Sequence, residues 1–177
     1  MQKQGLRESV GEILDLIHNE INVIPPEQII LAGISQGCAT AIHALFNSGH
    51  KFGGFVGLSG WLPYVNQIED ICRTQSEAVE RIQYIKAISS CNREVLTASR
   101  NEECLETPVF LGHCKNDEVV PYMNGEMMCK GLQDLGMQVE WHAYEYGGHW
   151  LNEPEGVDDL TEFLKYCSSQ SSKSTTY

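Results

Sequence analysis

The feature that most constrains the fold is a short apolar run that leads directly into a turn rich in small residues. Residues 28–33 read Gln-Ile-Ile-Leu-Ala-Gly, a strand-sized and almost continuous apolar segment. This pattern is typical of a parallel strand that is buried on both faces. Residues 33–37 then have the form Gly-x-Ser-x-Gly, and the small and apolar residues 38–46 predict a buried helix. A strand, a tight turn and a helix in this order indicate an α/β unit.

The rest of the chain repeats this alternation. Further strands are predicted at 52–58, 108–112 and 137–144, and further helices at 6–21, 122–135 and 157–166. The chain has 177 residues, of which 42% are hydrophobic, which is enough for one domain with one core. The sequence therefore predicts a single α/β domain over residues 1–167, with a mostly parallel sheet flanked by helices.

Two stretches depart from the alternation. Residues 64–107 are polar and have only a weak helical pattern, so we expect a partly helical insertion that is either a surface excursion or a lid near the site. The tail, residues 168–177, is rich in serine and has nothing to bury. It is predicted to be disordered.

Charge and cysteine usage exclude several classes of function. The chain has 12 Lys+Arg and 24 Asp+Glu residues and a net charge of −12, which argues against nucleic-acid binding and against docking on anionic lipid. No apolar run approaches the roughly 18 residues of a membrane span, and the first residues lack the apolar region of a signal peptide. Seven cysteines without a Cys-x-x-Cys pair favour reduced thiols in the cytoplasm, without a metal site.

Three residues have the order and setting of a catalytic triad. Ser35 lies in the Gly-x-Ser-x-Gly turn, at the start of the predicted helix. A serine hydroxyl is a weak nucleophile until a histidine, oriented by an acid, takes its proton. Asp117 follows the strand at 108–112, and His149 follows the strand at 137–144. In this architecture the nucleophile, the acid and the histidine follow one another along the chain, each at the carboxyl end of a strand.

Several other assignments compete with this triad. Because the chain has 16 glycines, the motif around Ser35 could also be a structural turn. His113 precedes Asp117 and breaks the expected order, whereas His142 falls within a strand and is expected to pack there. Glu118 is the nearest alternative acid, but a solvated carboxylate is the better interpretation. The remaining histidines, His18, His43 and His50, are expected to be surface or packing residues.

Four segments together carry a family resemblance: Gly33-Ile34-Ser35-Gln36-Gly37-Cys38-Ala39, Leu58-Ser59-Gly60-Trp61-Leu62-Pro63, Asp117-Glu118-Val119-Val120-Pro121 and Gly148-His149. They resemble the acyl-protein thioesterase branch of the phospholipase/carboxylesterase family, whose members are α/β-hydrolases. The resemblance covers roughly residues 6–166 except for 64–107. That stretch is longer than in compact members and is similar to fungal ones.

The resemblance implies a function and a set of roles. It implies hydrolysis of thioesters on S-palmitoylated proteins, or of carboxylic and lysophospholipid esters, without a metal or cofactor. Ser35 would attack the acyl carbonyl, His149 would relay the proton, and Asp117 would hold the imidazole. The backbone N–H of Gln36 would be one oxyanion donor. The substrate-binding residues Trp61 and Leu62 would lie beside the acyl group.

The resemblance also contains a departure. Relatives carry several strands and a His-Gly-rich loop ahead of the nucleophile, whereas 34 residues with one predicted helix precede Ser35 here. We therefore expect an N-terminally truncated α/β-hydrolase sheet, with the apolar strand at 29–33 as an exposed edge that favours self-association. A non-catalytic remnant that binds acyl groups or partner proteins is the alternative to an enzyme.

Overall fold

A parallel sheet forms the centre of the protein. The computed structural model describes residues 3–89 and 102–171. Its strands are β1 (Ile30–Ile34), β2 (Gly54–Leu58), β3 (Val109–Cys114) and β4 (Val139–Tyr144), which pair in the order β1-β2-β3-β4. All three pairings are parallel, so the carboxyl ends of the strands lie at the same end of the sheet. The predicted fold class is confirmed.

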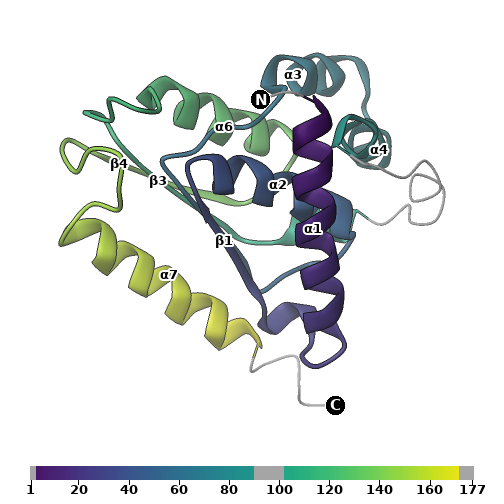
Figure 1. Ribbon diagram of the computed structural model, residues 1–177, viewed down its shortest axis with the longest axis horizontal. Coiled ribbons are helices and arrows are strands. Elements are labelled where there is room, and N and C mark those ends of the chain that lie inside the picture. The colour runs from purple at the N-terminus through teal and green to yellow at the C-terminus, as the bar shows by residue number, and fades with distance from the viewer. Residues whose placement is uncertain (1–2, 90–101, 172–177) are drawn as a thin grey trace.

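Helices cover the two faces of the sheet unequally. The helices are α1 (Lys3–Ile21), α2 (Gln36–Ser48), α3 (Val65–Thr74), α4 (Ala78–Ser89), α6 (Tyr122–Asp134) and α7 (Glu155–Ser171), with short 3₁₀ helices at Pro26–Gln28 and Glu103–Glu106. Among these, α2 and α6 pack on one face, with α1, α3 and α4 outside them, and α7 lies on the opposite face (Figure 1). No helix in the described ranges is long and apolar enough to cross a membrane.

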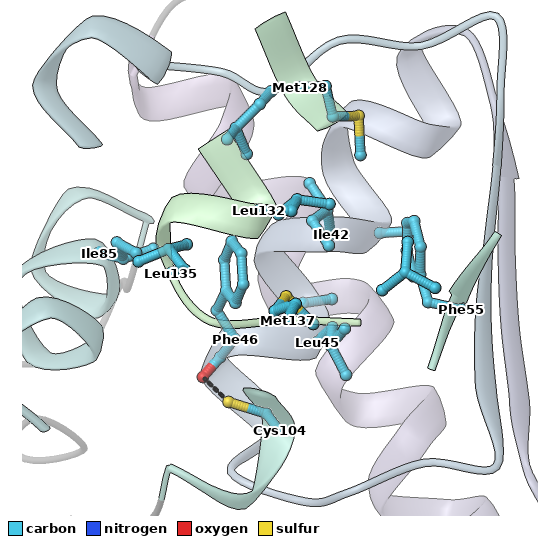
Figure 2. Close-up of a cluster of buried hydrophobic side chains, with 14 of the residues drawn as sticks. Ile42, Leu45, Phe46, Phe55, Ile85, Cys104, Met128, Leu132, Leu135 and Met137 are labelled. Carbon is cyan, nitrogen blue, oxygen red and sulfur yellow. Dashed lines mark hydrogen bonds between the residues drawn. The ribbon is translucent and has the colours of Figure 1, made fainter. Parts of the chain in front are cut away.

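The main core surrounds α2. Every residue of this helix from position 38 to 47 is buried, because the helix lies between the sheet and the outer helices. Figure 2 shows side chains of α2, including Phe46, packed among Leu132, Leu135 and Met137. A helix in such a position is expected to be mostly apolar. The helix predicted from residues 38–46 is thus confirmed, and it places the turn at Ser35 against a rigid support.

The strand β1 differs from its neighbours in exposure. Ile30 is 36% exposed and Ala32 is also exposed, whereas all six residues of β3 are buried. The apolar pattern predicts burial on both faces, and this is wrong for β1. Within the described residues no strand pairs with its outer side, and α7 packs on Val56 and Phe110 of the inner strands. The expectation of an exposed edge strand is confirmed.

The polar stretch from 64 to 107 forms a packed layer where the structure describes it. Its helices α3 and α4 contribute Ile68, Ile82 and Ile85 to the core, and Arg7 of α1 donates to the carbonyls at the end of α4. These two helices are therefore not a surface excursion. Their burial comes from tertiary partners that the polar composition does not reveal. Residues 90–101 lie outside the described residues, and the expectation that this stretch forms a lid stays a prediction.

The predicted disordered tail is partly wrong. Helix α7 continues to Ser171, so residues 168–171 are helical, and only 172–177 lie outside the described residues. The hydroxyls of Ser168 and Ser169 donate to the carbonyls of Leu164 and Tyr166 at 2.9 and 2.7 Å. Hydroxyl groups can bond one turn back along a helix, so these serines continue α7 without burying apolar surface.

Candidate active site

Ser35 occupies a strained turn between β1 and α2. It is the single residue between the two elements, and its backbone angles are φ 55° and ψ −125°, a region that non-glycine residues rarely adopt. Gly33 makes the turn possible, because a Cβ there would lie 2.5 Å from the backbone of Gly37 and Cys38. The Ser35 amide donates to Leu58 O at 2.9 Å, and its hydroxyl makes no capping bond to α2. The hydroxyl is thus not used to cap the helix.

The start of α2 provides a favourable place for negative charge beside Ser35. Gln36 is the first residue of the helix, and the first N–H groups of a helix have no acceptor within it. The positive end of the helix dipole lies at the same point. Cys38, one turn further, is not a competing nucleophile, since burial raises the pKa of its thiol to about 12.

Asp117 and His149 are in direct contact. His149 Nδ1 lies 2.9 Å from Asp117 Oδ2, and Asp117 Oδ1 accepts hydrogen bonds from the amides of Val119 (2.8 Å) and Val120 (2.9 Å). Burial raises the pKa of Asp117, but the hydrogen bonds from His149, Val120 and Val119 outweigh it and leave the pKa below its usual range. The carboxylate is therefore ionised at neutral pH and accepts from Nδ1–H, so Nε2 of His149 is free to accept a proton.

Backbone bonds hold the two loops of this pair together. Lys115 N donates to Tyr144 O at 2.7 Å, and the amide of Gly148 donates to Asn116 Oδ1 at 2.9 Å. Gly147 and Gly148 have φ values of 137° and 66°, which residues with a side chain rarely adopt. The glycines let the chain after β4 turn back, so that the next residue, the histidine, meets the loop after β3.

Ser35 stands at the same end of the sheet as this pair. The hydrogen bonds from Ser35 N to Leu58 O, from Ser59 N to Gly112 O and from Lys115 N to Tyr144 O link the four strand ends in turn. No hydrogen bond joins Ser35 to His149 in the part of the chain that the structure describes. The structure thus brings Asp117 and His149 into contact, and it places Ser35 at the same end of the sheet.

A hollow of about 230 Å³ adjoins the loop after β2. Trp61, which is partly exposed, and Leu62, which is buried, line it together with Asn124 and Met127 of α6. A larger hollow of about 800 Å³ lies among residues that precede β2, β3 and β4, at the opposite end of the sheet. We assign the smaller hollow to the candidate active site, because loops at the carboxyl ends of parallel strands form the ligand crevice in open α/β sheets.

The structure also reveals a residue that the sequence analysis set aside. His113 Nε2 lies 3.3 Å from Asp117 Oδ2, although the order of the residues along the chain argues against His113 as a triad member. The four-residue spacing across the end of β3 was a signal that could have drawn attention to it. His142, a residue of β4, packs on Phe110, as predicted. Glu118 is exposed, as predicted. No group of three or more His, Cys, Asp or Glu side chains in the described residues could hold a metal ion.

The fold is that of the α/β-hydrolases, as comparison with solved structures shows. Arabidopsis thaliana SOBER1 superposes with a TM-score of 0.71 at 21% identity, covering 94% of this chain and 66% of that one. Zea mays acyl-protein thioesterase 2 superposes with a TM-score of 0.63, also at 21% identity, covering 93% and 65%. The chain belongs to the phospholipase/carboxylesterase family, whose model matches residues 1–79 and 71–168.

Relatives in fungi are longer than this chain. Acyl-protein thioesterase 1 of Gibberella zeae is 30% identical over 163 residues, which make up 92% of this chain and 58% of that protein. Acyl-protein thioesterase 1 of Candida albicans is 32% identical over 149 residues, or 84% of this chain and 53% of that protein. The chain thus spans somewhat more than half the length of these relatives.

Proposed function

We propose that the protein is a serine hydrolase with Ser35, His149 and Asp117 as its catalytic triad. The observation that carries the proposal is the 2.9 Å hydrogen bond between His149 Nδ1 and Asp117 Oδ2, formed at the end of the sheet where Ser35 stands. An ionised, buried carboxylate that fixes one nitrogen of an imidazole leaves the other nitrogen as a base. The strained turn at Ser35 supports the role of nucleophile, because strain of this kind concentrates at active sites.

The proposed reaction has two steps. In the first, His149 Nε2 takes the proton of Ser35 Oγ as the oxygen attacks the acyl carbonyl, and then gives it to the departing thiol or alcohol. In the second, water attacks the acyl-serine while the imidazole again accepts and returns a proton. Asp117 keeps the imidazole in one tautomer and stabilises its charged form. No metal or cofactor takes part.

We further infer that the N–H of Gln36 stabilises the oxyanion. It lies directly after Ser35, at the positive end of α2, where an N–H group has no acceptor within the helix. Removing a single donor of this kind costs on the order of 10²–10³ in rate where it has been tested. The turn therefore affects the rate of the proposed reaction, because it sets the position of this N–H group.

The proposed substrates are acyl thioesters of S-palmitoylated proteins. The fungal relatives are named acyl-protein thioesterase 1, and this supports the proposed substrate class. The hollow beside Trp61 and Leu62 is a candidate place for the part of the acyl chain next to the carbonyl. The six free cysteines in the described residues support a reducing, cytoplasmic environment.

A second candidate function is hydrolysis of carboxylic or lysophospholipid esters. It is supported by the description of the family itself, phospholipase/carboxylesterase. Both candidates use the same triad and differ only in the leaving group and the acyl chain. Turnover of a palmitoyl thioester compared with a short-chain ester at equal concentration decides between them: a preference for the short ester favours the second.

A fluorophosphonate probe tests the triad, because it phosphonylates only an activated serine. The wild type should be labelled and Ser35→Ala should not. Ser59→Ala is a matched control, since Ser59 also follows a strand with positive φ (46°) but is fully buried. This control should be labelled like the wild type. Equal labelling of Ser35→Ala and wild type would refute the proposal, and absence of labelling in the wild type would favour the non-catalytic alternative.

A further inference from the structure

A second imidazole lies against the carboxylate of Asp117. His113 Nε2 is 2.9 Å from Val120 O and 3.3 Å from Asp117 Oδ2. Both side chains are buried, with exposed fractions of 1% for His113 and 0% for Asp117. Asp117 thus contacts two histidines through the same oxygen, and the proposed triad uses only one of them.

The contacts of His113 assign its tautomer. Val120 O is a carbonyl oxygen and Asp117 Oδ2 belongs to an ionised carboxylate, so both can only accept. Nε2 must therefore carry a hydrogen, which is shared between the two acceptors. The shorter distance makes Val120 O the main acceptor and the carboxylate the weaker one.

His113 closes a loop of hydrogen bonds around the turn that holds Asp117. Val120 N donates to Asp117 Oδ1, and Val120 O accepts from His113, which itself contacts Asp117 Oδ2. The carboxylate is thus held on both of its oxygens, and it can rotate only if these bonds break. A carboxylate fixed in this way keeps Oδ2 directed at His149.

The imidazole of His113 is itself held rigidly. Its ring packs against Tyr122 and Trp141, with ring centroids 6.0 and 6.4 Å away. A Cβ on Gly125 would lie only 2.5 Å from His113 Nδ1, so the helix α6 passes directly beside the ring. His113 therefore connects β3, α6 and the Asp117 turn, and it has little room to move.

We propose that His113 is a positioning residue for the hydrolase reaction, acting through Asp117 rather than on the substrate. The proposal rests on the proposed function, in which Asp117 orients His149. Loss of the Nε2–H group should let the carboxylate and its turn move, so that the imidazole of His149 is less often aligned as a base. The expected effect is a lower kcat with an unchanged KM, because His113 does not touch the substrate.

Two replacements of His113 separate the hydrogen bond from the bulk of the ring. His113→Phe keeps a planar ring and removes the donor. His113→Gln keeps a donor, because the glutamine Nε2 is the same number of bonds from Cα as the imidazole Nε2. We expect kcat for a short-chain ester to fall roughly three- to tenfold in His113→Phe, the loss typical of a hydrogen bond whose main acceptor is a neutral carbonyl. The Gln variant should recover most of that loss.

His142→Phe is the matched control. His142 also pairs with an aspartate, with Nδ1 3.0 Å from Asp159 Oδ2, but this pair joins β4 to α7, on the face of the sheet that α7 covers. Its kcat should equal that of the wild type. Rates are compared per amount of folded protein, measured by near-ultraviolet circular dichroism, so that loss of folded enzyme is not mistaken for a slower reaction.

Amide hydrogen exchange provides a readout that does not depend on activity. The amides of Val119 and Val120 donate to Asp117 Oδ1, so they should exchange roughly tenfold faster in His113→Phe and at the wild-type rate in His142→Phe. If His113→Phe changes neither the exchange nor the kcat of an active wild type, the positioning role is overturned. If exchange accelerates but Ser35→Ala still reacts with the probe, the proposed function fails, while the hold of His113 on Asp117 stands.

Discussion

The buried histidine His43 should make the stability of the protein depend on pH. It lies in α2 with 0% exposure, and its Nε2 is 3.2 Å from Pro63 O. Burial lowers the pKa of His43 to about 4, and the hydrogen bond to Pro63 O opposes this only in part. Nδ1 has no hydrogen-bond partner within the described residues, so a proton there would leave a buried charge uncompensated.

The size of the effect follows from the two pKa values. In the unfolded chain a histidine titrates near 6.5, so between that pH and about 4 the unfolded state binds a proton that the folded state does not. The contribution to stability is therefore complete above pH 6.5 and is lost as the pH falls. Between pH 7 and pH 5 the free energy of unfolding should decrease by about 2 kcal/mol from this residue alone.

Urea unfolding at pH 7 and pH 5 tests this value. His43→Gln keeps an N–H that can reach Pro63 O and does not titrate, so its stability should fall by about 2 kcal/mol less than that of the wild type over this range. His18→Gln is the control, because His18 lies exposed on α1 and is not buried as His43 is. If His43→Gln and the wild type lose the same stability between the two pH values, the reasoning about His43 is refuted.

Three further predictions follow from the site. Gly33→Ala should lower the stability by about 1–3 kcal/mol or more, because its Cβ would meet backbone atoms at 2.5 Å, whereas Gly37→Ala, with open space, should leave the melting temperature unchanged or slightly raised; equal melting temperatures would contradict this. Asp117→Asn should reduce kcat by about 10⁴, since an amide that donates to Nδ1 would leave the hydrogen on Nε2 of His149; an ester assay with near wild-type kcat would argue against the triad. Cys38, with a thiol pKa of about 12, should resist iodoacetamide at pH 8 until the protein is unfolded, as measured by mass spectrometry; rapid modification of the native protein would show that the thiol is accessible.

Much of the fold could be predicted from local patterns. Each observed strand overlaps a predicted one, because short apolar runs bounded by turns are set by nearby residues. The position of Ser35 at the end of β1 followed from the Gly-x-Ser-x-Gly turn, whose requirement for Gly33 is itself local. The contact of Asp117 with His149 was predicted from the order of the strands along the chain, since parallel strands end together.

Most of the predictions that failed concerned burial by distant partners. The apolar pattern of β1 favours burial on both faces, although the expected truncation of the sheet places it at an edge, and the polar stretch with α3 and α4, expected as a surface excursion or a lid, contributes isoleucines to the core. A hydrophobic pattern shows which face of a segment can be buried. It does not identify the other segment that packs against that face. The contact of His113 with Asp117 is a local one, across a turn of four residues, and the order of triad residues along the chain does not predict it.

The sequence by itself determined the strands, most of the helices, their order and the three candidate triad residues, because spacing, turn chemistry and chain order are properties of neighbouring residues. Only the tertiary structure decided how the carboxylate of Asp117 is held. Val119, Val120 and His113 contact its oxygens, and α6 packs against the imidazole of His113. The physical reason is that the orientation of a buried side chain depends on all the groups around it, and these come together only when the chain folds.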